Sequence, residues 1–398
     1  MTAPLCVMLV AAEASGDLLG ADLIRALRAR LGTGVRFVGV GGAAMAAEGV
    51  TSPFDITQLS ILGLVEGFKA YPRVLRLADS TAALARRERP DVAVLIDSWG
   101  FNLRVAVRLR RSLPDLLLVK YVAPQVWASR PGRAKTLAAS VDHLLSINAL
   151  DARYFEPEGL PTTFVGNPAL AREPAPHDPA AFRRAHDIAP TAPLLLIAPG
   201  SRPAEIARMG PPFTDAARRL AAALPDLRFV VPVADTVSGA IRQWAEGLPT
   251  EVVLVSDSDA KTAAAQAATA ALACSGTVTT ELALAGLPMV VGYRLGAITY
   301  ALLSRMMTAK FITLFNLAAD REVAPEFVQT ACTGPNLAAA LSPLLTNLNR
   351  RAEQVAAQNA ALAKMGRGGP DPAILAAETI MTLIGKRAGT RLTAPDLR

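Results

Sequence analysis

The chain has 398 residues, which is too long for one ordinary domain and fits two. Hydrophobic residues make up 52% and charged residues 19%, a composition typical of a globular protein on the apolar side of average. The formal net charge of +7 suits a phosphate-bearing partner, but no basic stripe with interleaved aromatic residues is present, so no nucleic-acid partner is expected.

Short apolar runs alternate with longer amphipathic stretches along the sequence. In the first half, runs that are apolar on both faces predict buried strands at 5–10, 35–40, 92–96, 116–122 and 144–147. In the second half, the same pattern predicts strands at 194–197, 229–233, 252–255, 270–274 and 289–291. Helix-length stretches such as 21–31 and 212–224 lie between them. The predicted fold class is α/β, with two Rossmann-like, doubly wound domains.

A proline-rich segment at 168–193 separates the two groups of strands and predicts a linker. We therefore predict an N-terminal domain at 1–167, a C-terminal domain at 194–386 and a polar tail at 387–398. Ligands of doubly wound sheets bind beyond the carboxyl ends of the strands, so a cleft between the domains is the expected site. The N-terminus lacks a basic region, and no clear apolar run reaches about 18 residues, so neither a signal peptide nor a spanning helix is expected.

Two carboxylates follow predicted strands of the first half. Glu13 begins a turn in which Ser15 and Gly16 suit an anion at a helix N-terminus, although Ser15 as a plain N-cap is the simpler alternative. Asp97 ends a buried strand, where partial desolvation would raise its pKa toward that of a general base. The alternative is that Asp97 is itself a helix N-cap, and the sequence gives the two roles equal weight.

Two loops of the second half suit phosphate groups, because their small residues let a ligand approach the backbone. They contain Gly200, Ser201, Arg202 and Glu205 after one strand, and Ser275, Gly276 and Thr277 after another. Glu281 lies one helical turn beyond Thr277, where a carboxylate can accept hydrogen bonds from a ribose. The alternative for this second loop is a capping box that binds no ligand.

Two further segments each allow a functional interpretation and a purely structural one. A polar cluster that includes Asn316, Arg321 and Glu322 fits either a site or a solvated helix face. The apolar segment 61–71, followed by many arginines, fits either an interfacial membrane contact or a core helix with a basic solvent face. The three cysteines and three histidines show no metal-ligand spacing, so no metal is expected.

The motifs, in their order, resemble those of the lipid-A-disaccharide synthase family over most of 5–341. They are Glu-Ala-Ser-Gly-Asp at 13–17, Gly-Val-Gly-Gly at 39–42, Leu-Gly-Leu-Val-Glu at 62–66, Ile-Asp-x-x-x-Phe-Asn at 96–102, Gln-Val-Trp-Ala at 125–128, Arg-Pro-Gly-Arg-Ala-Lys at 130–135, Phe-Val-Gly-x-Pro at 164–168, Pro-Gly-Ser-Arg at 199–202, Ser-Gly-Thr at 275–277 and Asn-Leu-x-x-x-Arg-Glu-Val-x-Pro-Glu at 316–326. The resemblance implies a GT-B fold and an inverting transfer from UDP-2,3-diacylglucosamine to 2,3-diacylglucosamine 1-phosphate. It also implies a β-1,6-linked disaccharide product, no metal or cofactor, and a peripheral position on the cytoplasmic face of an anionic inner membrane.

The resemblance also implies roles for particular residues. Asp97 would be the base that deprotonates the acceptor hydroxyl, with Glu13 as the fallback. The donor would be held by the two phosphate loops, by Glu281 and by Asn316, Arg321 and Glu322. Acyl chains or lipid would contact the apolar segment through Ile61, Leu62, Leu64, Val65 and Phe68.

Some positions depart from the family's pattern, and Gly100 matters most because it removes a carboxylate near Asp97. These departures leave the acceptor half less supported than the nucleotide half. Two rivals stay open: another GT-B transferase or a sugar-nucleotide epimerase with a different acceptor, and a catalytically silent binder of nucleotide or lipid. Whether the chain forms a homo-oligomer also stays open.

Overall fold

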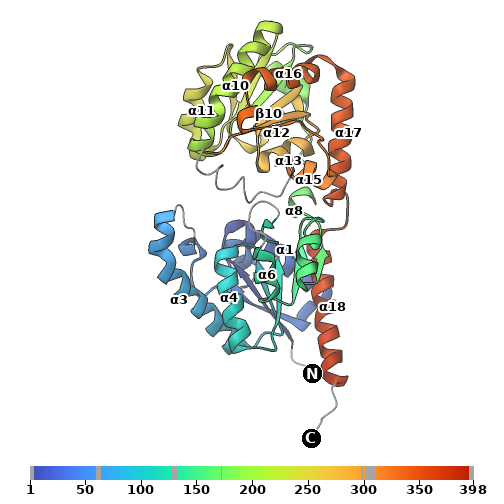
Figure 1. The fold of residues 1–398 in the computed structure, drawn as a ribbon. Coiled ribbons are helices and arrows are strands. Elements are labelled where there is room, and N and C mark those ends of the chain that lie inside the picture. The colour runs from blue at the N-terminus through green and yellow to red at the C-terminus, as the bar shows by residue number, and fades with distance from the viewer. Residues whose placement is uncertain are drawn as a thin grey trace. The chain divides into compact units, whose positions relative to one another are not determined.

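The computed structural model describes residues 4–59, 64–126, 132–171, 173–296, 300 and 310–393. The chain divides into two compact units, each of them a layered α/β structure (Figure 1). Unit 1 contains Met1–Ala171 and Gly368–Arg398, and unit 2 contains Arg172–Arg367. Unit 2 is therefore inserted within the sequence of unit 1.

Unit 1 is built on a six-stranded parallel sheet in the order β2-β1-β3-β4-β5-β6. Its strands are β1 (Leu5–Ala11), β2 (Val35–Val40), β3 (Val92–Ile96), β4 (Leu117–Tyr121), β5 (His143–Ser146) and β6 (Thr162–Phe164). Its helices are α1 (Ala14–Leu31), α2 (Ala43–Ala47), α3 (Leu64–Glu88), α4 (Trp99–Ser112), α6 (Gly132–Ala138), α7 (Ala152–Phe155), α8 (Pro168–Ala171) and α18 (Pro372–Thr393).

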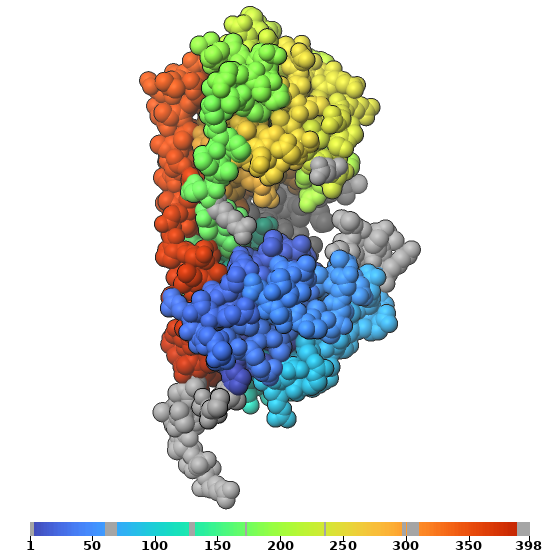
Figure 2. Space-filling model, turned by 180° about the vertical axis from the view of Figure 1, so that it is seen from behind, coloured from blue at the N-terminus to red at the C-terminus, as the bar shows by residue number. Residues whose placement is uncertain are grey.

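Alternate residues of β1 face two separate cores, because successive side chains of a strand point to opposite sides of the sheet. Met8 and Val10 belong to the core beneath α3, α4 and α6. Val7 and Leu9 belong to the core beneath α1 and α18, to which α18 contributes Ile380. The C-terminal helix, red in Figure 2, lies against the blue N-terminal segment. Helix α18 is thus an integral layer of unit 1.

Unit 2 has a second six-stranded parallel sheet, in the order β12-β11-β10-β7-β8-β9. Its strands are β7 (Leu194–Ala198), β8 (Arg228–Pro232), β9 (Val252–Val255), β10 (Ala270–Cys274), β11 (Met289–Tyr293) and β12 (Glu326–Val328). Its helices are α9 (Pro179–Ala185), α10 (Pro203–Ala223), α11 (Ser238–Ala245), α12 (Ser258–Ala267), α13 (Thr277–Leu284), α15 (Leu314–Ala319), α16 (Gly334–Thr346) and α17 (Leu348–Lys364). Short 3-10 turns occur at Gly32–Gly34, Ile56–Leu59, Glu156–Glu158, Asp235–Val237 and Gln329–Ala331.

Each sheet reverses its strand order at one point, and ligands of doubly wound sheets bind where this reversal leaves room between neighbouring loops. In unit 1 the reversal lies between β1 and β3, and in unit 2 it lies between β7 and β10. We call the carboxyl ends of these strand pairs the unit-1 and unit-2 switch points. The carboxylates predicted at Glu13 and Asp97 follow β1 and β3, and the two predicted phosphate loops follow β7 and β10.

The α/β fold class predicted from the sequence is confirmed, and all ten predicted strands are present. The predicted domain boundaries differ from the observed division in two places. The segment predicted as a linker contains α9, which packs against α12 and belongs to unit 2. The last helix, α18, packs against α1 in unit 1, although the sequence placed residues up to 386 in the C-terminal domain. Among the described helices, none combines the length and hydropathy needed to span a bilayer.

Candidate active site

The unit-1 switch point is built around an unusual turn after β3. Asp97 and Ser98 both have left-handed backbones, with φ of +49° and +37°. Each such residue other than glycine costs on the order of 1–3 kcal/mol, so the surrounding structure must hold the turn in place. The Asp97 N–H donates to the Tyr121 carbonyl at 2.8 Å, which continues the pairing of β3 with β4. Helix α4 then begins with Ser98, rather than Asp97, as its N-cap.

Two buried side chains hold this turn from beneath. The Lys120 ammonium, on β4, donates to the carbonyl oxygens of Asp97, Leu95 and Tyr121, the last two at 3.3 Å. The Asn102 amide, on α4, donates to the carbonyls of Ile96 at 2.7 Å and Asp97 at 3.1 Å. The Asp97 carbonyl therefore accepts from two side chains where the sheet ladder ends.

Lys120 was not predicted as a site residue, because sequence reasoning treated it as part of an apolar strand. It is 3% exposed, and burial lowers the pKa of its ammonium to about 7, although the nearby charges of Asp97 and Glu13 act in the opposite direction. The only sequence signal was a lone lysine within the run 116–122. A pKa strongly shifted by burial beside charged partners marks a candidate functional site.

Glu13 lies at the other side of this switch point, as the N-cap of α1. Burial of its carboxyl raises the pKa, and the neighbouring charge of Asp97 raises it further. Hydrogen bonding with Ser98 and the charge of Lys120 act in the opposite direction. The structure therefore brings the two predicted carboxylates together, and it adds a buried cation beside them.

The predicted anion turn at Ser15 and Gly16 has a clear structural function. Asp17, in the first turn of α1, accepts hydrogen bonds from the backbone N–H groups of Gly42, Ala44 and Met45, at 2.7, 2.8 and 3.1 Å. This carboxylate joins the two glycine-containing motifs of the first half. Ser15 is exposed and lies inside the helix rather than at its N-cap, so the simpler alternative for Ser15 is wrong.

At the unit-2 switch point, the loop after β7 is held by Glu205. The Glu205 carboxylate accepts from the Ser201 N–H at 3.0 Å and from the Arg202 guanidinium at 2.9 Å. Gly200 has φ of +129°, and a Cβ there would lie 2.6 Å from the Glu205 Cβ. Glu205 thus occupies the donors that a phosphate would need, whereas the sequence had grouped it with the ligand-binding residues.

The loop after β10 leads into α13 with Gly276 as its N-cap. The alternative capping box is not formed, because the N-cap is Gly276, which has no side chain, and Thr277 lies inside the helix. The Thr279 hydroxyl donates to the Gly276 carbonyl at 2.7 Å. Gly276, Thr277 and Glu281 are all exposed, and no atom lies within 4 Å of a Cβ placed on Gly276. Among the described residues, none covers this helix N-terminus at Gly276, where an anion would be favoured.

Asn316 has a different role from the one predicted. Its side chain is fully buried, accepts from the N–H groups of Val323 and Ala324, and donates to the Ala324 carbonyl and the Glu326 carboxylate. Its hydrogen-bonding groups are thus occupied within the protein, and it organises the segment around α15 rather than presenting a group to a ligand.

The Glu326 carboxylate is the centre of this network. It accepts from the N–H groups of Ile312 and Thr313, at 2.7 and 2.9 Å, and from the Thr313 hydroxyl at 2.6 Å. Ile312 in turn accepts the Ser275 hydroxyl at 3.1 Å. Ser275 therefore fastens the loop after β10 to the segment before α15, and sequence reasoning had weighed only its ligand-binding role.

Arg321 and Glu322 lie elsewhere in unit 2. They line a pocket of about 300 Å³ with residues of α16 and α17, among them Gln354. Gln354 donates to the carbonyl of Met289, the first residue of β11, at 2.7 Å. This pocket therefore reaches the amino end of β11, whereas the phosphate loops lie at the carboxyl ends of the strands.

Arg208 is a second residue that sequence reasoning missed. It lies on α10, and its guanidinium is 3.3 Å from the position a Cβ would take at Gly296, just beyond β11. The charges of Arg202 and Arg208 both act to lower the pKa of Tyr293, although burial dominates and raises it. Two arginines thus lie near the carboxyl ends of β7 and β11.

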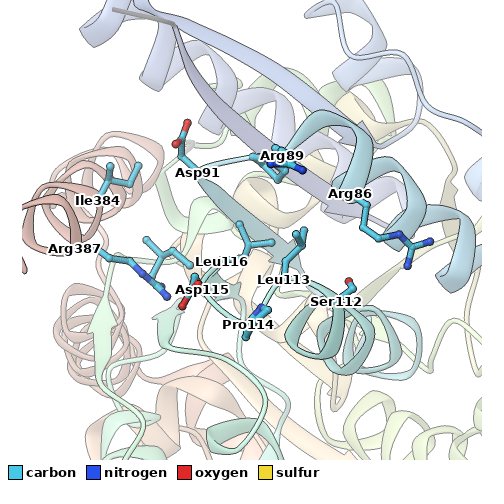
Figure 3. Close-up of a pocket in the computed structure, with 12 residues that line it drawn as sticks. Arg86, Arg89, Asp91, Ser112, Leu113, Pro114, Asp115, Leu116, Ile384 and Arg387 are labelled. Carbon is cyan, nitrogen blue, oxygen red and sulfur yellow. The ribbon is translucent and has the colours of Figure 1, made fainter. Parts of the chain in front are cut away.

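Unit 1 also has a pocket, of about 780 Å³, which lies away from the unit-1 switch point (Figure 3). It is lined by Asp91 and Leu117, next to or at the amino ends of β3 and β4, and by Arg86 and Arg387. It is not part of the site predicted at the carboxyl ends.

Of the predicted acyl-contact residues, Ile61 and Leu62 lie outside the described residues, as do the side chains of Leu64, Val65 and Phe68.

Comparison with known proteins gives the family. The model of the lipid-A-disaccharide synthetase family matches residues 7–370. A lipid-A-disaccharide synthase of Paramagnetospirillum magneticum is 44% identical over 384 residues, which cover 95% of this chain and 97% of that protein. The synthase of Pseudomonas syringae pv. syringae is 38% identical, over 97% of this chain and 99% of its own length.

Solved structures support the fold. A putative UDP-N-acetylglucosamine 2-epimerase from Listeria monocytogenes superimposes with a TM-score of 0.63 at 15% identity, over 98% of each chain. The glycotransferase of kitacinnamycin superimposes with a TM-score of 0.58 at 15% identity, over 96% of this chain and 99% of that one. The fold is that of GT-B enzymes. With the family match over nearly its whole length, the chain belongs to the lipid-A-disaccharide synthase family of glycosyltransferases.

Proposed function

We propose that this chain transfers the 2,3-diacylglucosaminyl group of UDP-2,3-diacylglucosamine to O6 of 2,3-diacylglucosamine 1-phosphate. The products are a β-1,6-linked disaccharide 1-phosphate and UDP. Membership of the family supports the reaction, and the arrangement at the unit-1 switch point supports the assignment of its residues. The observation that carries the assignment is the strained turn that holds Asp97 beside Glu13 at the ends of β3 and β1.

Asp97 is the general base in this proposal. Its carboxylate accepts the proton of the acceptor hydroxyl as that oxygen attacks C1 of the donor sugar. The bond between C1 and the diphosphate oxygen breaks, UDP leaves with the bonding electrons, and the configuration at C1 inverts. Glu13 has a raised pKa and is the fallback for the same role.

A cation near Asp97 suits the phosphate of the acceptor. Trp99, two residues beyond Asp97, carries the Arg133 guanidinium over its ring, 5.1 Å from the ring centroid. Stacking of this kind orients a guanidinium, and the planar fork of a guanidinium matches the geometry of phosphate oxygens. We propose that this pair, together with the open position at Gly100, shapes acceptor binding.

The unit-2 switch point holds the UDP group in this proposal. The α13 N-terminus, with Gly276 and Thr277, receives the diphosphate, and Glu281 accepts hydrogen bonds from the ribose. Ser201 and Arg202 bind phosphate once the Glu205 carboxylate moves aside. Arg208 adds positive charge. A metal or other cofactor has no role in the proposed reaction.

Both substrates carry acyl chains, so we propose that the enzyme works as a peripheral protein on the cytoplasmic face of an anionic inner membrane. The apolar segment 61–71 contacts lipid, and the arginines that follow it attract the anionic surface. Binding of the protein to vesicles with and without anionic lipid measures this directly.

The decisive measurement is UDP release by the purified protein given UDP-2,3-diacylglucosamine, with and without the monosaccharide 1-phosphate. Acceptor-dependent release together with a disaccharide product supports the proposal. UDP binding without release in the presence of this acceptor overturns the acceptor assignment. Change of the donor without any acceptor, giving an epimer or a free sugar, overturns the transfer itself.

A further inference from the structure

The Asp97 carbonyl marks the place where the parallel pairing of β3 with β4 ends. Beyond Ile96 the chain turns into the left-handed region, so the Asp97 carbonyl no longer faces a backbone N–H of β4. Two side chains replace that partner, and both are buried: Lys120 is 3% exposed and Asn102 is 1% exposed. The conformation of Asp97 therefore depends on donors from two other elements.

We propose that Lys120 is a positioning residue, whose ammonium holds the backbone of Asp97 so that its carboxylate faces the acceptor hydroxyl. This inference rests on the proposed role of Asp97 as the base. Lys120 itself has no contact with substrate in this proposal, because it lies beneath the turn and is directed toward backbone carbonyls.

The number of acceptors matches the number of protons on the amine. An ammonium group has three N–H donors, and Lys120 donates to three carbonyls, those of Leu95, Asp97 and Tyr121. These carbonyls come from the ends of two adjacent strands, so a single side chain fixes both strand ends at once. Asn102 cannot replace it, because its amide also donates to Ile96 and, at 3.4 Å, to Val10.

The charge of Lys120 has a second effect, which distinguishes it from Asn102. The charged groups that act on the ammonium are Asp97, after β3, and Glu13, after β1. A nearby cation stabilises the ionised form of a carboxylate, and the Lys120 charge lowers the pKa of Glu13 accordingly. Removal of Lys120 therefore both loosens the turn and takes away a positive charge that lowers the pKa of Glu13.

The test is Lys120→Met, which keeps the approximate length of the side chain and removes its donors and charge. We expect kcat to fall about 10- to 100-fold, while KM for the donor and the Kd for UDP change less than twofold. The acidic limb of the pH profile of kcat/KM is expected to move to higher pH, because the switch point loses a buried positive charge.

Two further variants separate positioning from general loss of stability. Asn102→Leu removes the neutral donor, so it should lower kcat and leave the acidic limb in place. Gln358→Leu is the control, because it removes a buried side-chain bond to a strand-flanking carbonyl, that of Leu287, in the other unit. Its kcat and pH profile should match those of the unaltered protein.

A folded Lys120→Met protein with normal kcat and an unmoved acidic limb overturns the inference. If that variant does not fold, Lys120→Arg serves instead: it keeps the charge and changes the geometry, so a lowered kcat with an unmoved limb is expected and a normal kcat overturns the inference. The proposed function fails separately, since it fails if the unaltered protein shows no acceptor-dependent UDP release, whatever Lys120 does.

Discussion

The two switch points solve the same geometric problem in different ways. Both sheets need a sharp turn between a buried strand and the helix that follows it. In the unit-2 turns that follow β7 and β10 the residues with positive φ are Gly200 and Gly276, which adopt such backbones at little cost. In unit 1 they are Asp97 and Ser98, which do so only at a cost and are held by buried side chains.

The difference fits what each turn has to present. A glycine turn exposes backbone N–H groups and lets a phosphate approach closely, so it suits binding. A turn made by an aspartate presents a side chain in one fixed direction, so it suits chemistry. Unit 1 thus contains the more strained and more buried arrangement, and it should be the more sensitive of the two to single substitutions.

The largest expected effect is that of Asp97→Ala. Loss of the proposed base should lower kcat by about 100-fold or more, while UDP binding stays unchanged because the residues proposed to bind UDP lie in unit 2. UDP release and calorimetric titration of UDP measure the two quantities. Glu281→Gln should instead weaken UDP binding, because Glu281 is the proposed partner of the ribose. Near-normal turnover by the Asp97 variant would move the role of the base to Glu13.

The next effect concerns stability against pH. Unfolded lysine keeps its proton up to a pKa of about 10.5, whereas burial lowers that of folded Lys120 to about 7. Between these values the unfolded state binds more protons, so the Lys120 contribution to stability rises with pH, by about 2 kcal/mol from pH 7 to pH 9. Urea unfolding of the unaltered protein and of Lys120→Met at both pH values isolates the Lys120 contribution to the free energy of unfolding. An equal pH dependence of stability in the two proteins would contradict this prediction.

A smaller effect is expected for Gly200→Ala. The new Cβ would lie 2.6 Å from the Glu205 Cβ, on a backbone with φ of +129°, so unit 2 should lose about 1–2 kcal/mol of unfolding free energy. Gly239→Ala is the control, because Gly239 lies within α11 and no atom lies within 4 Å of a Cβ placed there. Equal stability of the two variants would show that the turn tolerates a side chain.

The smallest effect is that of Glu205→Gln. Its carboxylate occupies the Ser201 N–H and the Arg202 guanidinium, so removing the charge should strengthen UDP binding about two- to fivefold. The effect is small because Arg202 is 76% exposed and solvent screens the pair. Glu251→Gln removes the same charge from an exposed position of unit 2 and controls for net charge. Weaker UDP binding by the Glu205 variant would restore its predicted role as a ligand residue.

The sequence predicted the strands and the positions of the strand-end loops well, because runs such as 92–96 and 270–274 are apolar on both faces and sharply bounded. It missed β6 and β12, since three residues are too few to form a pattern. It also assigned α18 to the wrong unit, because amphipathic periodicity shows that a helix packs on something but not on which sheet.

The chemistry of the site was harder to predict than its position. Lys120 is separated from Asp97 by a whole helix, and only the pairing of β3 with β4 brings them together. Asn316 was predicted as a ligand residue from the family resemblance, whereas the polar cluster around it in sequence left a solvated helix face equally open. Its bonds to Val323, Ala324 and Glu326 are tertiary contacts that no local pattern reports.

The insertion of unit 2 within unit 1 has a consequence for how the chain is made. A ribosome completes unit 2 at Arg367, before α18 has been synthesised. Until then the face of unit 1 that carries Leu9 and Ile24 lacks the helix that supplies Ala376 and Ile380 to its core. The usual N-terminal-first order of folding cannot hold for the whole of unit 1, because the part that bears Asp97 is completed only after unit 2 has been synthesised.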